Sequence, residues 1–234
     1  MITIKQLRKA YGDATVLDVP NLCIGKNCIV SLVGNNGAGK TTLLRAINDL
    51  TVIQSGAVFI ENEDISKTED WKLLVSSYID DSFIIPYLKP KEYFDFVARA
   101  YQLSNEKYAM AIQMIETFLG KDILTSNKYN RNFSKGVIQK IGIVAALIPM
   151  TEYIILDEPF SNLDPSSQRE LKNLILKLHS DFQITFIISS HDLFLIKDLS
   201  QKIILLDKGS ILLNEENSPQ TFEYVENYFN AQVG

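Results

Sequence analysis

The residues of this chain best suited to chemistry lie in one short segment, GNNGAGKTT, at residues 34–42. It matches the pattern G-x-x-x-x-G-K-[ST] between an apolar run and an amphipathic run, the context of a phosphate-binding loop that joins a strand to a helix. Glycines let the backbone curl until successive N–H groups point at one anion, and the helix N-terminus adds its dipole. Lys40 would place a positive charge on the β- and γ-phosphates, and the Thr41 hydroxyl would ligate Mg²⁺. A glycine-rich turn with a surface lysine is the disfavoured alternative.

Acidic residues follow a second apolar run, in YIILDEP at residues 153–159. At the predicted strand end, Asp157 is suited to hold Mg²⁺ through water, and Glu158 to polarise an attacking water as general base. Taken alone, the same pattern fits a strand that ends in a solvated acidic turn, but the phosphate-binding loop favours catalysis. His191 follows a third apolar run, ITFIISSHDL, where it is either a turn residue or a contact to the γ-phosphate.

Composition limits the class of protein. The chain has 234 residues, 46% of them hydrophobic, which suits one compact domain over residues 1–234. Its net charge of −5 gives no overall attraction to nucleic acid. No apolar run approaches the roughly 20 residues that cross a bilayer, and the start MITIKQLRKAYG has a strand pattern rather than that of a signal peptide. We therefore expect a soluble chain in a reducing compartment, with Cys23 and Cys28 as small buried hydrophobic residues.

The periodicity of apolar residues predicts an α/β fold. Short buried runs alternate with helical patterns, which indicates a parallel sheet covered on both faces. Between residues 83 and 140 no buried strand is predicted, and the apolar spacing is helical instead. The predicted strands are 2–7, 15–24, 28–33, 57–60, 153–156, 184–189 and 202–206, and the predicted core helices are 40–49, 136–148, 165–179 and 192–199.

Taken together, GNNGAGKTT, ILDEP, SNLDP and SSHD occur in an order and spacing that resemble the ATP-binding subunit of ABC transporters over nearly the whole chain. The resemblance implies a P-loop NTPase fold of the RecA-like type. In that fold a mostly parallel core sheet is joined by an N-terminal antiparallel β region and an inserted helical subdomain. Here the core would comprise residues 1–80 and 141–234, and the helical subdomain residues 83–140.

The resemblance also assigns roles by position. Tyr11 matches the aromatic residue that stacks on adenine, although a strand-end aromatic packed on the core also fits. Glu158 matches the catalytic glutamate and His191 the switch histidine. Asp164 matches the aspartate that couples the two nucleotide sites, and it also fits an N-cap before Pro165. The residues implied to contact ATP are Asn35, Asn36, Gly37, Ala38, Gly39, Lys40, Thr41 and Thr42.

The family signature LSGGQ is changed here. The aligned residues are FSKGV at 133–137, called the signature segment below, in which Lys135 replaces the first glycine. Ser134 and Gly136 are retained, so a hydroxyl and backbone N–H groups at a helix N-terminus can still face the γ-phosphate of a partner subunit's ATP. Lys135 would add positive charge there. Ser134 as an ordinary helix cap is the alternative.

The family's glutamine-containing linker is also changed. The segment SYIDDSFIIPYLKPKEYF contains no glutamine, and Asp81, or with less support Asp80, stands in its place. A carboxylate can ligate Mg²⁺ or its waters, so Asp81 is predicted to join Thr41 and Asp157 in a metal site. Apolar residues of this linker would form part of a groove for a membrane partner, or else belong to the core: Phe83, Ile84, Ile85 and Tyr87.

The implied function is that of a bacterial ATPase that powers a membrane transporter through ATP-driven dimerisation, with ATP and Mg²⁺ as cofactors. Its partners would be an integral membrane permease and a second ABC ATPase subunit, identical or different, on the cytoplasmic face of the plasma membrane. Export is favoured over import because the SKG-type signature resembles that of bacterial export-type subunits. A soluble ABC ATPase of cofactor assembly or translation is the alternative. A nucleic-acid-processing relative is disfavoured because long coiled-coil or zinc insertions are absent, and no nucleic-acid partner is expected.

Overall fold

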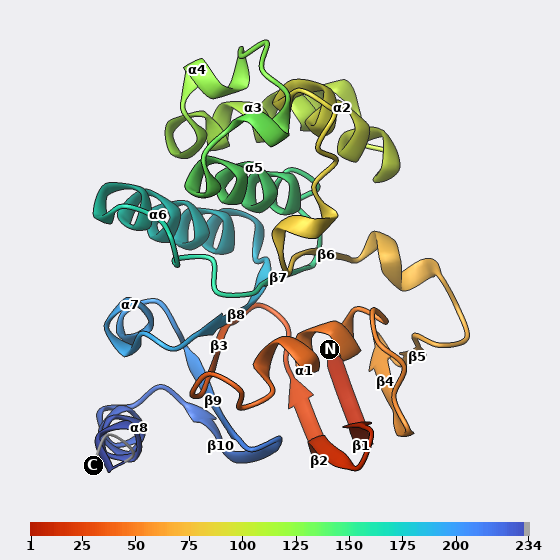
Figure 1. Cartoon of the computed structure of the whole chain (residues 1–234), viewed down its shortest axis with the longest axis vertical. Coiled ribbons are helices and arrows are strands. Elements are labelled where there is room, and N and C mark those ends of the chain that lie inside the picture. The colour runs from red at the N-terminus through yellow and green to blue at the C-terminus, as the bar shows by residue number, and fades with distance from the viewer. Residues whose placement is uncertain (232–234) are drawn as a thin grey trace.

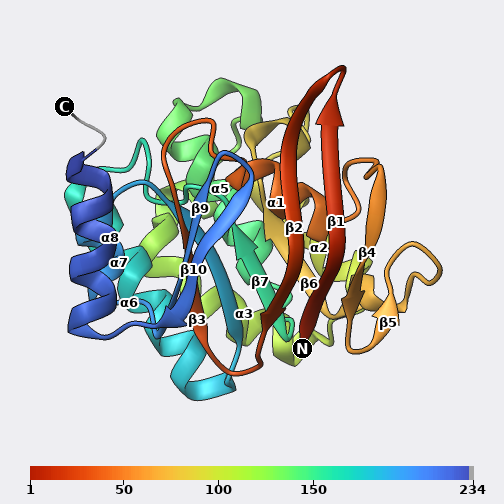
Figure 2. The same ribbon diagram turned by 90° about the horizontal axis from the view of Figure 1, so that it is seen from below.

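The computed structural model describes residues 1–231, which form two sheets (Figure 1). The smaller sheet is antiparallel, with the strand order β2–β1–β4–β5. Figure 2 shows β1 and β2 as long neighbouring strands, with β4 and β5 to one side of them. The strands of this sheet are β1 (Ile2–Tyr11), β2 (Ala14–Ile24), β4 (Ser55–Ile60) and β5 (Glu63–Asp64).

The larger sheet has the order β10–β9–β3–β8–β7–β6, in which only β10 runs antiparallel to its neighbour. Every residue of β3, β7 and β8 is buried, as expected of parallel strands covered on both faces. Because parallel strands end at the same edge, the segments that follow β3, β7 and β8 meet there. The strands are β3 (Ile29–Val33), β6 (Val75–Tyr78), β7 (Tyr153–Leu156), β8 (Thr185–Ser190), β9 (Lys202–Asp207) and β10 (Ser210–Glu216).

Helices cover both faces of the larger sheet. On one face, α1 (Lys40–Ile47) packs between the two sheets, where Leu43 and Leu44 join one apolar cluster with residues of both. On the other face lie α5 (Lys135–Leu147) and α6 (Pro165–Phe182), which pack with β7 and β8 around a second cluster (Figure 1). A smaller cluster joins α7 (Leu193–Lys197) and α8 (Pro219–Ala231) to β9.

A further helical layer lies beyond α5 and α6, on the side away from the smaller sheet (Figure 1). It contains α2 (Pro90–Ala100), α3 (Asn105–Leu119) and α4 (Lys121–Leu124), and α3 packs on both α5 and α6. Short 3₁₀ turns at Asp81–Phe83 and Asn130–Asn132 lie where the chain enters and leaves this layer, and another at Asp70–Leu73 lies between β5 and β6. The predicted absence of strands between residues 83 and 140 is confirmed. The division at residue 140 stays a prediction, and α5 is continuous across that residue.

The predicted fold class is confirmed, while several elements differ from their predicted bounds. The first helix ends at Ile47 rather than residue 49, because Asp49 adopts a left-handed conformation with φ 53°. The third core helix extends to Phe182, where Gln183 turns the chain with φ 55°. The last predicted core helix, 192–199, is only the short α7, which begins after its cap Asp192.

Sequence analysis missed β6, β10 and α8. Strand β6 reads VSSY and lacks an apolar run, yet Ser76 is buried because its hydroxyl donates to the Ala146 carbonyl oxygen at 2.6 Å. Strand β10 is a half-exposed edge strand. Among residues 1–231, no helix combines the length and the apolar character that crossing a bilayer requires.

Candidate active site

The phosphate loop, residues 34–42, leaves the carboxyl end of β3 and runs into α1. Gly37 and Gly39 have φ values of 83° and 106°, which side chains disfavour. A methyl group on Gly39 would also lie 3.0 Å from the Val16 carbonyl oxygen. The loop lines a hollow of about 240 Å³ beside Glu158. The loop residues that line it are Asn35, Asn36, Gly37, Gly39, Lys40, Thr41 and Thr42.

Lys40 is 7% exposed, so its charge is almost removed from water. Its Nζ donates to the Gly34 carbonyl oxygen at 2.7 Å and lies 3.3 Å from Glu158 Oε1. A buried ammonium needs such partners to offset its lost hydration. The side chain is thus held beside the hollow and aligned with the loop backbone, which suits it to bind an anion there.

A hydroxyl–carboxylate pair lies next to this lysine. Thr41 Oγ1 donates to Asp157 Oδ2 at 2.5 Å, and the Ser189 hydroxyl at the end of β8 donates to Asp157 Oδ1. Burial raises the pKa of the Asp157 carboxyl, while the two hydroxyl donors and Lys40 act in the opposite direction. Two hard oxygen ligands side by side at a phosphate-binding loop are the donor set that Mg²⁺ takes, so these residues fit that ion.

Glu158 faces the same hollow from the end of β7. Its backbone is left-handed, with φ 45°, which is uncommon for a residue with a long side chain and typical of strained functional positions. The backbone N–H donates to Ser189 Oγ at 2.8 Å. The carboxylate lies between two cations or potential cations, with Oε1 near Lys40 and Oε2 2.9 Å from His191 Nδ1. The structure therefore brings Lys40, Thr41, Asp157, Glu158 and His191 together.

Two predicted nucleotide contacts lie outside the residues that line this hollow. Tyr11 ends β1 and is 54% exposed, and Lys9 Nζ lies 4.4 Å from its ring centroid. The ring is thus not packed into the core. Ala38 is buried, and its carbonyl oxygen accepts a hydrogen bond from Gly209 N–H at 2.9 Å. This bond fixes the phosphate loop to the turn between β9 and β10.

The two linker aspartates have different partners. Asp81 Oδ1 accepts a hydrogen bond from the Tyr78 hydroxyl at 2.6 Å, and burial together with this bond raises the pKa of Tyr78. Asp80 Oδ2 accepts from Arg45 Nη2 at 2.8 Å, and Arg45 lies one turn after Thr41 on α1. It is therefore Asp80, the less favoured candidate, whose carboxylate is tied to the helix of the phosphate loop.

The signature segment is organised differently. Ser134 occupies the N-cap position of α5, yet its side chain makes no capping hydrogen bond. Ser134 and Lys135 are both exposed, and neither belongs to the residues that line the hollow. A methyl group on Gly136 would lie 2.8 Å from the Asn162 carbonyl oxygen, so this glycine permits close approach of α5 to the loop after Glu158. Within one chain, the residues of the signature segment therefore do not line the hollow at the phosphate loop.

Asp164 caps α6, as expected. Its Oδ1 accepts from the N–H groups of Ser166 at 3.0 Å and Ser167 at 3.1 Å, and Pro165 occupies the first helical position. The hydrogen bonds from Ser167 are the main cause of a lowered pKa of this exposed carboxyl. Sequence reasoning gave no role to Ser189 or Arg45. The serine was visible in SSHD, but only the sheet order shows that it faces Asp157.

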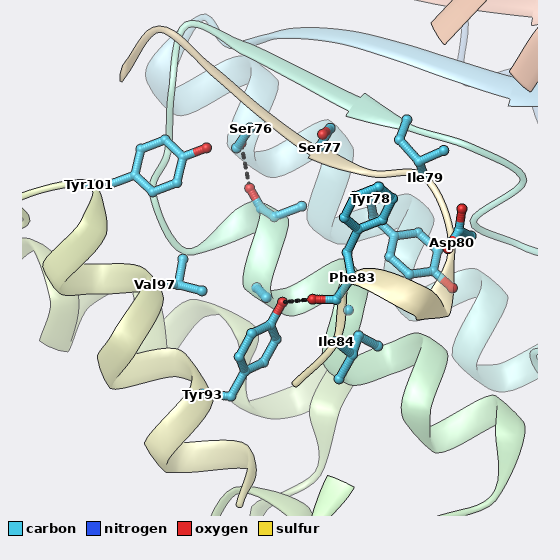
Figure 3. Close-up of a pocket in the computed structure, with 13 residues that line it drawn as sticks. Ser76, Ser77, Tyr78, Ile79, Asp80, Phe83, Ile84, Tyr93, Val97 and Tyr101 are labelled. Carbon is cyan, nitrogen blue, oxygen red and sulfur yellow. Dashed lines mark hydrogen bonds between the residues drawn. The ribbon is translucent and has the colours of Figure 1, made fainter. Parts of the chain in front are cut away.

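A second cavity, of about 150 Å³, lies where the linker enters the helical layer (Figure 3). Tyr78, Ile84 and Tyr93 point into it, and the Tyr93 hydroxyl donates to the Phe83 carbonyl oxygen at 3.4 Å. The apolar linker residues that were predicted to form a groove differ in their exposure. Ile84 is buried, whereas Phe83 and Tyr87 are 51% and 65% exposed.

Comparison with known protein families identifies the family of this chain. Residues 17–161 match the family described as ABC transporter. The chain belongs to the ABC transporter family. Residues 127–197 also match a family described as AAA domain, putative AbiEii toxin, Type IV TA system, over the stretch that carries the signature segment and Glu158.

Curated relatives of this ABC protein cover nearly its whole length. The lantibiotic transport ATP-binding protein SrtF of Streptococcus pyogenes is 30% identical over 233 residues, covering 100% of this chain and 97% of its own. The phosphonates import ATP-binding protein PhnC of Fusobacterium nucleatum is 28% identical and covers 93% of each chain. The methionine import ATP-binding protein MetN of Campylobacter jejuni is 30% identical, over 91% of this chain and 69% of its own.

Solved structures agree with the fold. One ATP-binding subunit of an ABC transporter superposes with a TM-score of 0.85 at 24% identity, covering 97% of this chain and 98% of its own. The bacterial ABC transporter cassette MJ0796, solved as a dimer, gives a TM-score of 0.82 at 25% identity, covering 93% and 99%. The chain is an ABC-type ATPase, the ATP-binding component of a membrane transport system.

Proposed function

We propose that this ABC ATPase works as a pair of identical subunits, each of which binds ATP at its phosphate loop and completes the other's site. The observation that carries the proposal is the position of the Glu158 carboxylate, held between Lys40 Nζ at 3.3 Å and His191 Nδ1 at 2.9 Å beside the hollow. A carboxylate there is suited to accept a proton from water that attacks a bound γ-phosphate.

Each residue of the site has a separate part in this mechanism. The loop N–H groups and Lys40 would hold the phosphates, and Tyr11, exposed at the end of β1, would stack on the adenine. Glu158 would orient the water and take its proton, while His191 would hold the carboxylate and sense the γ-phosphate. Thr41 and Asp157 would hold Mg²⁺, which supplies neutralising charge to the phosphates when bound.

The second subunit would supply what one chain lacks. Ser134, Lys135 and Gly136 would face the partner's γ-phosphate, where a hydroxyl, backbone N–H groups and a positive charge can all bind an anion. The exposure of Ser134 and its unused capping capacity support this role. Asp164 caps the start of α6, just after the loop that follows Glu158, and would couple the two ATP sites.

Asp81 is the proposed metal ligand of the linker, although its present partner is the Tyr78 hydroxyl. For that role its carboxylate would have to leave Tyr78 and turn toward Thr41. Asp80 is the alternative: its Oδ2 is bonded to Arg45 of α1 at 2.8 Å, and its Oδ1 accepts from the Ser82 N–H at 2.8 Å and from the Ser82 hydroxyl. Replacing each aspartate by Ala and measuring the Mg²⁺ concentration for half-maximal turnover separates the two.

We place the protein on the cytoplasmic face of the plasma membrane, with an integral membrane permease docked at the linker. The cavity of Figure 3, lined by both polar and apolar side chains, and the exposed Phe83 and Tyr87 offer a surface for a short helix of that permease. We propose export on the basis of the signature segment. Relatives such as PhnC and MetN are import subunits, so sequence similarity alone does not choose the direction.

Affinity purification tests the permease. The tagged chain is recovered from gently solubilised membranes, and the proteins that co-purify are identified by mass spectrometry. A multi-span membrane protein in stoichiometric amount supports the proposal. Phe83→Ser should lower its recovery, whereas Leu212→Ser, an exposed residue on β10 at the opposite edge of the larger sheet, should not. Recovery from the soluble fraction alone would favour an ABC ATPase that works without a permease.

Direction is tested with inverted membrane vesicles, in which the ATPase faces the outside. For the substrate class that the co-purified permease indicates, added ATP should drive accumulation in the vesicle lumen if the system exports. ATP-dependent release of preloaded substrate would instead establish import and contradict the proposed direction.

A further inference from the structure

One buried glutamine joins the signature helix to the loop that carries Glu158. Gln139 lies on α5 and is only 2% exposed. Its Nε2 donates to the carbonyl oxygens of Glu158 at 3.2 Å and Pro159 at 3.0 Å, and its Oε1 accepts from Asn162 Nδ2 at 3.1 Å. A single side chain from another element therefore fixes both the start and the end of the turn at residues 158–162.

This turn needs to be held because its backbone is unusual at both ends. Glu158 has φ 45° and Asn162 has φ 55°, both in the left-handed region. Asparagine tolerates this region, but glutamate disfavours it, and such a residue keeps its conformation only where its surroundings impose it. The Glu158 N–H is bonded to Ser189 Oγ at 2.8 Å and the Glu158 carbonyl to Gln139, so the peptide groups on both sides are fixed.

The direction of the Glu158 side chain depends on these backbone bonds. Its carboxylate reaches Lys40 on one side and His191 on the other, at 3.3 and 2.9 Å. The Glu158 carbonyl oxygen also accepts from the Ser161 hydroxyl at 2.8 Å and the Ser161 N–H at 3.2 Å, but both donors belong to the turn itself. Without Gln139 no donor from another element would hold this carbonyl, so the turn could shift and carry the carboxylate away from both partners. Displacement of a catalytic group by about 1 Å can lower a rate by roughly 100-fold.

We propose that Gln139 is a positioning residue for Glu158, and that through α5 it ties the placement of this carboxylate to the signature segment. The inference rests on the proposed role of Glu158 in hydrolysis. Gly136 and Gln139 both contact the same turn, since Gly136 approaches the Asn162 carbonyl oxygen too closely for a larger residue. Contact of Ser134 with the partner's ATP would thus change the position of the Glu158 carboxylate of the same chain, which belongs to the other ATP site.

The first test replaces Gln139 by Met, which keeps the length of the side chain and removes its hydrogen bonds. We expect kcat to fall about 10–100-fold, as for a misplaced catalytic group, while the dissociation constant for ATP stays within about 3-fold because the phosphate loop is untouched. Gln168→Met is the matched control. Gln168 donates from α6 to Phe160 of the same turn at 3.0 Å but has no bond to Glu158, so its kcat should change little.

The decisive measurement combines Gln139→Met with Glu158→Gln in single-turnover hydrolysis. If Gln139 acts through the Glu158 carboxylate, the double variant should be no slower than Glu158→Gln alone. Rate losses that multiply would show that Gln139 supports the fold in general, and would overturn the inference. If Glu158→Gln alone left turnover unchanged, the proposed function itself would fail, which distinguishes the two outcomes.

A second variant keeps the inference testable if Gln139→Met does not fold, as judged by thermal denaturation. Gln139→Glu preserves the shape of the side chain, and its ionised carboxylate cannot donate to the Glu158 carbonyl oxygen. Its turnover relative to wild type should rise as the pH is lowered and the new carboxyl becomes protonated. A ratio that is constant with pH would contradict a role for the donated hydrogen bond.

Discussion

The phosphate loop and the signature segment both lie at the N-terminus of a helix, but their polar side chains are held to different degrees. At the loop, Lys40 is buried and bonded to the Gly34 carbonyl oxygen, and Thr41 is bonded to Asp157. At the signature, Ser134 and Lys135 are exposed, and the serine side chain makes no capping bond. The phosphate loop is preorganised within the chain, while the signature segment leaves exposed polar groups that we propose act on a partner's ATP.

The preorganised surface should show the largest mutational effect. Glu158→Gln removes the general base but keeps the shape of the side chain, so turnover should fall about 10²–10⁴-fold. ATP binding should persist, because the loop N–H groups and Lys40 are retained, and Lys40 loses only its ion pair with this carboxylate at 3.3 Å. Steady-state phosphate release and equilibrium nucleotide binding measure the two quantities. Unchanged turnover would remove Glu158 from the catalytic role.

Lys40→Ala tests the binding function of the same surface. Loss of a charged donor to the phosphates should weaken ATP binding roughly 10–100-fold. Binding is measured by titration with a fluorescent ATP analogue, and Lys26→Ala serves as the control because that lysine pairs with Glu152 and Glu61 away from the loop. Normal affinity in Lys40→Ala would count against the assignment of the phosphate loop.

The exposed surface should behave differently. Ser134→Ala should leave ATP binding to the isolated chain unchanged, since Ser134 does not line the hollow. Turnover of the pair should fall about 10-fold, because the hydroxyl would donate to an anion in the partner's site. If the variant lost ATP affinity as a separated subunit, the distinction between the two surfaces would be wrong.

The smallest effect is expected at Lys135. Because this side chain is exposed, Lys135→Ala should raise the KM for ATP by only about 2–5-fold. The difference should shrink as ionic strength rises and screens the charge. Measurements of KM at low and high salt check both points, and a loss of turnover that is independent of salt would indicate that the lysine acts in another way.

The two surfaces also differ in how well sequence predicts them. The phosphate loop, Asp157 and Glu158 follow from local patterns, because each comes directly after a buried strand and parallel strands end at one edge. The contacts of Ser189 and Gln139 depend on sheet order and helix packing across 32 and 19 residues of sequence, which no local pattern contains. The linker aspartates show the same limit. Arg45 pairs with Asp80 rather than Asp81 because of how α1 packs, and no local pattern predicts that packing.

The missed elements have a related cause. Periodicity finds a strand when its buried residues are apolar, as in β3, β7 and β8. Strand β6 buries Ser76, whose hydroxyl is bonded to the Ala146 carbonyl oxygen of α5 and to Thr151, so its burial is decided by tertiary partners rather than by hydropathy. Element boundaries shifted for a local reason, because left-handed residues such as Asp49 and Gln183 end helices without a glycine or proline signal.

The central claim is that each ATP site is shared between two chains, and mixing two variants of impaired activity tests it directly. Lys40→Ala and Ser134→Ala chains are purified separately, combined in equal amounts and assayed for ATP hydrolysis. In a mixed pair, the intact loop of one chain meets the intact signature of the other. Activity should therefore rise toward about a quarter of wild type, since about half of the pairs are mixed and each has one intact site. No gain on mixing, with exchange of subunits confirmed, would contradict a shared site.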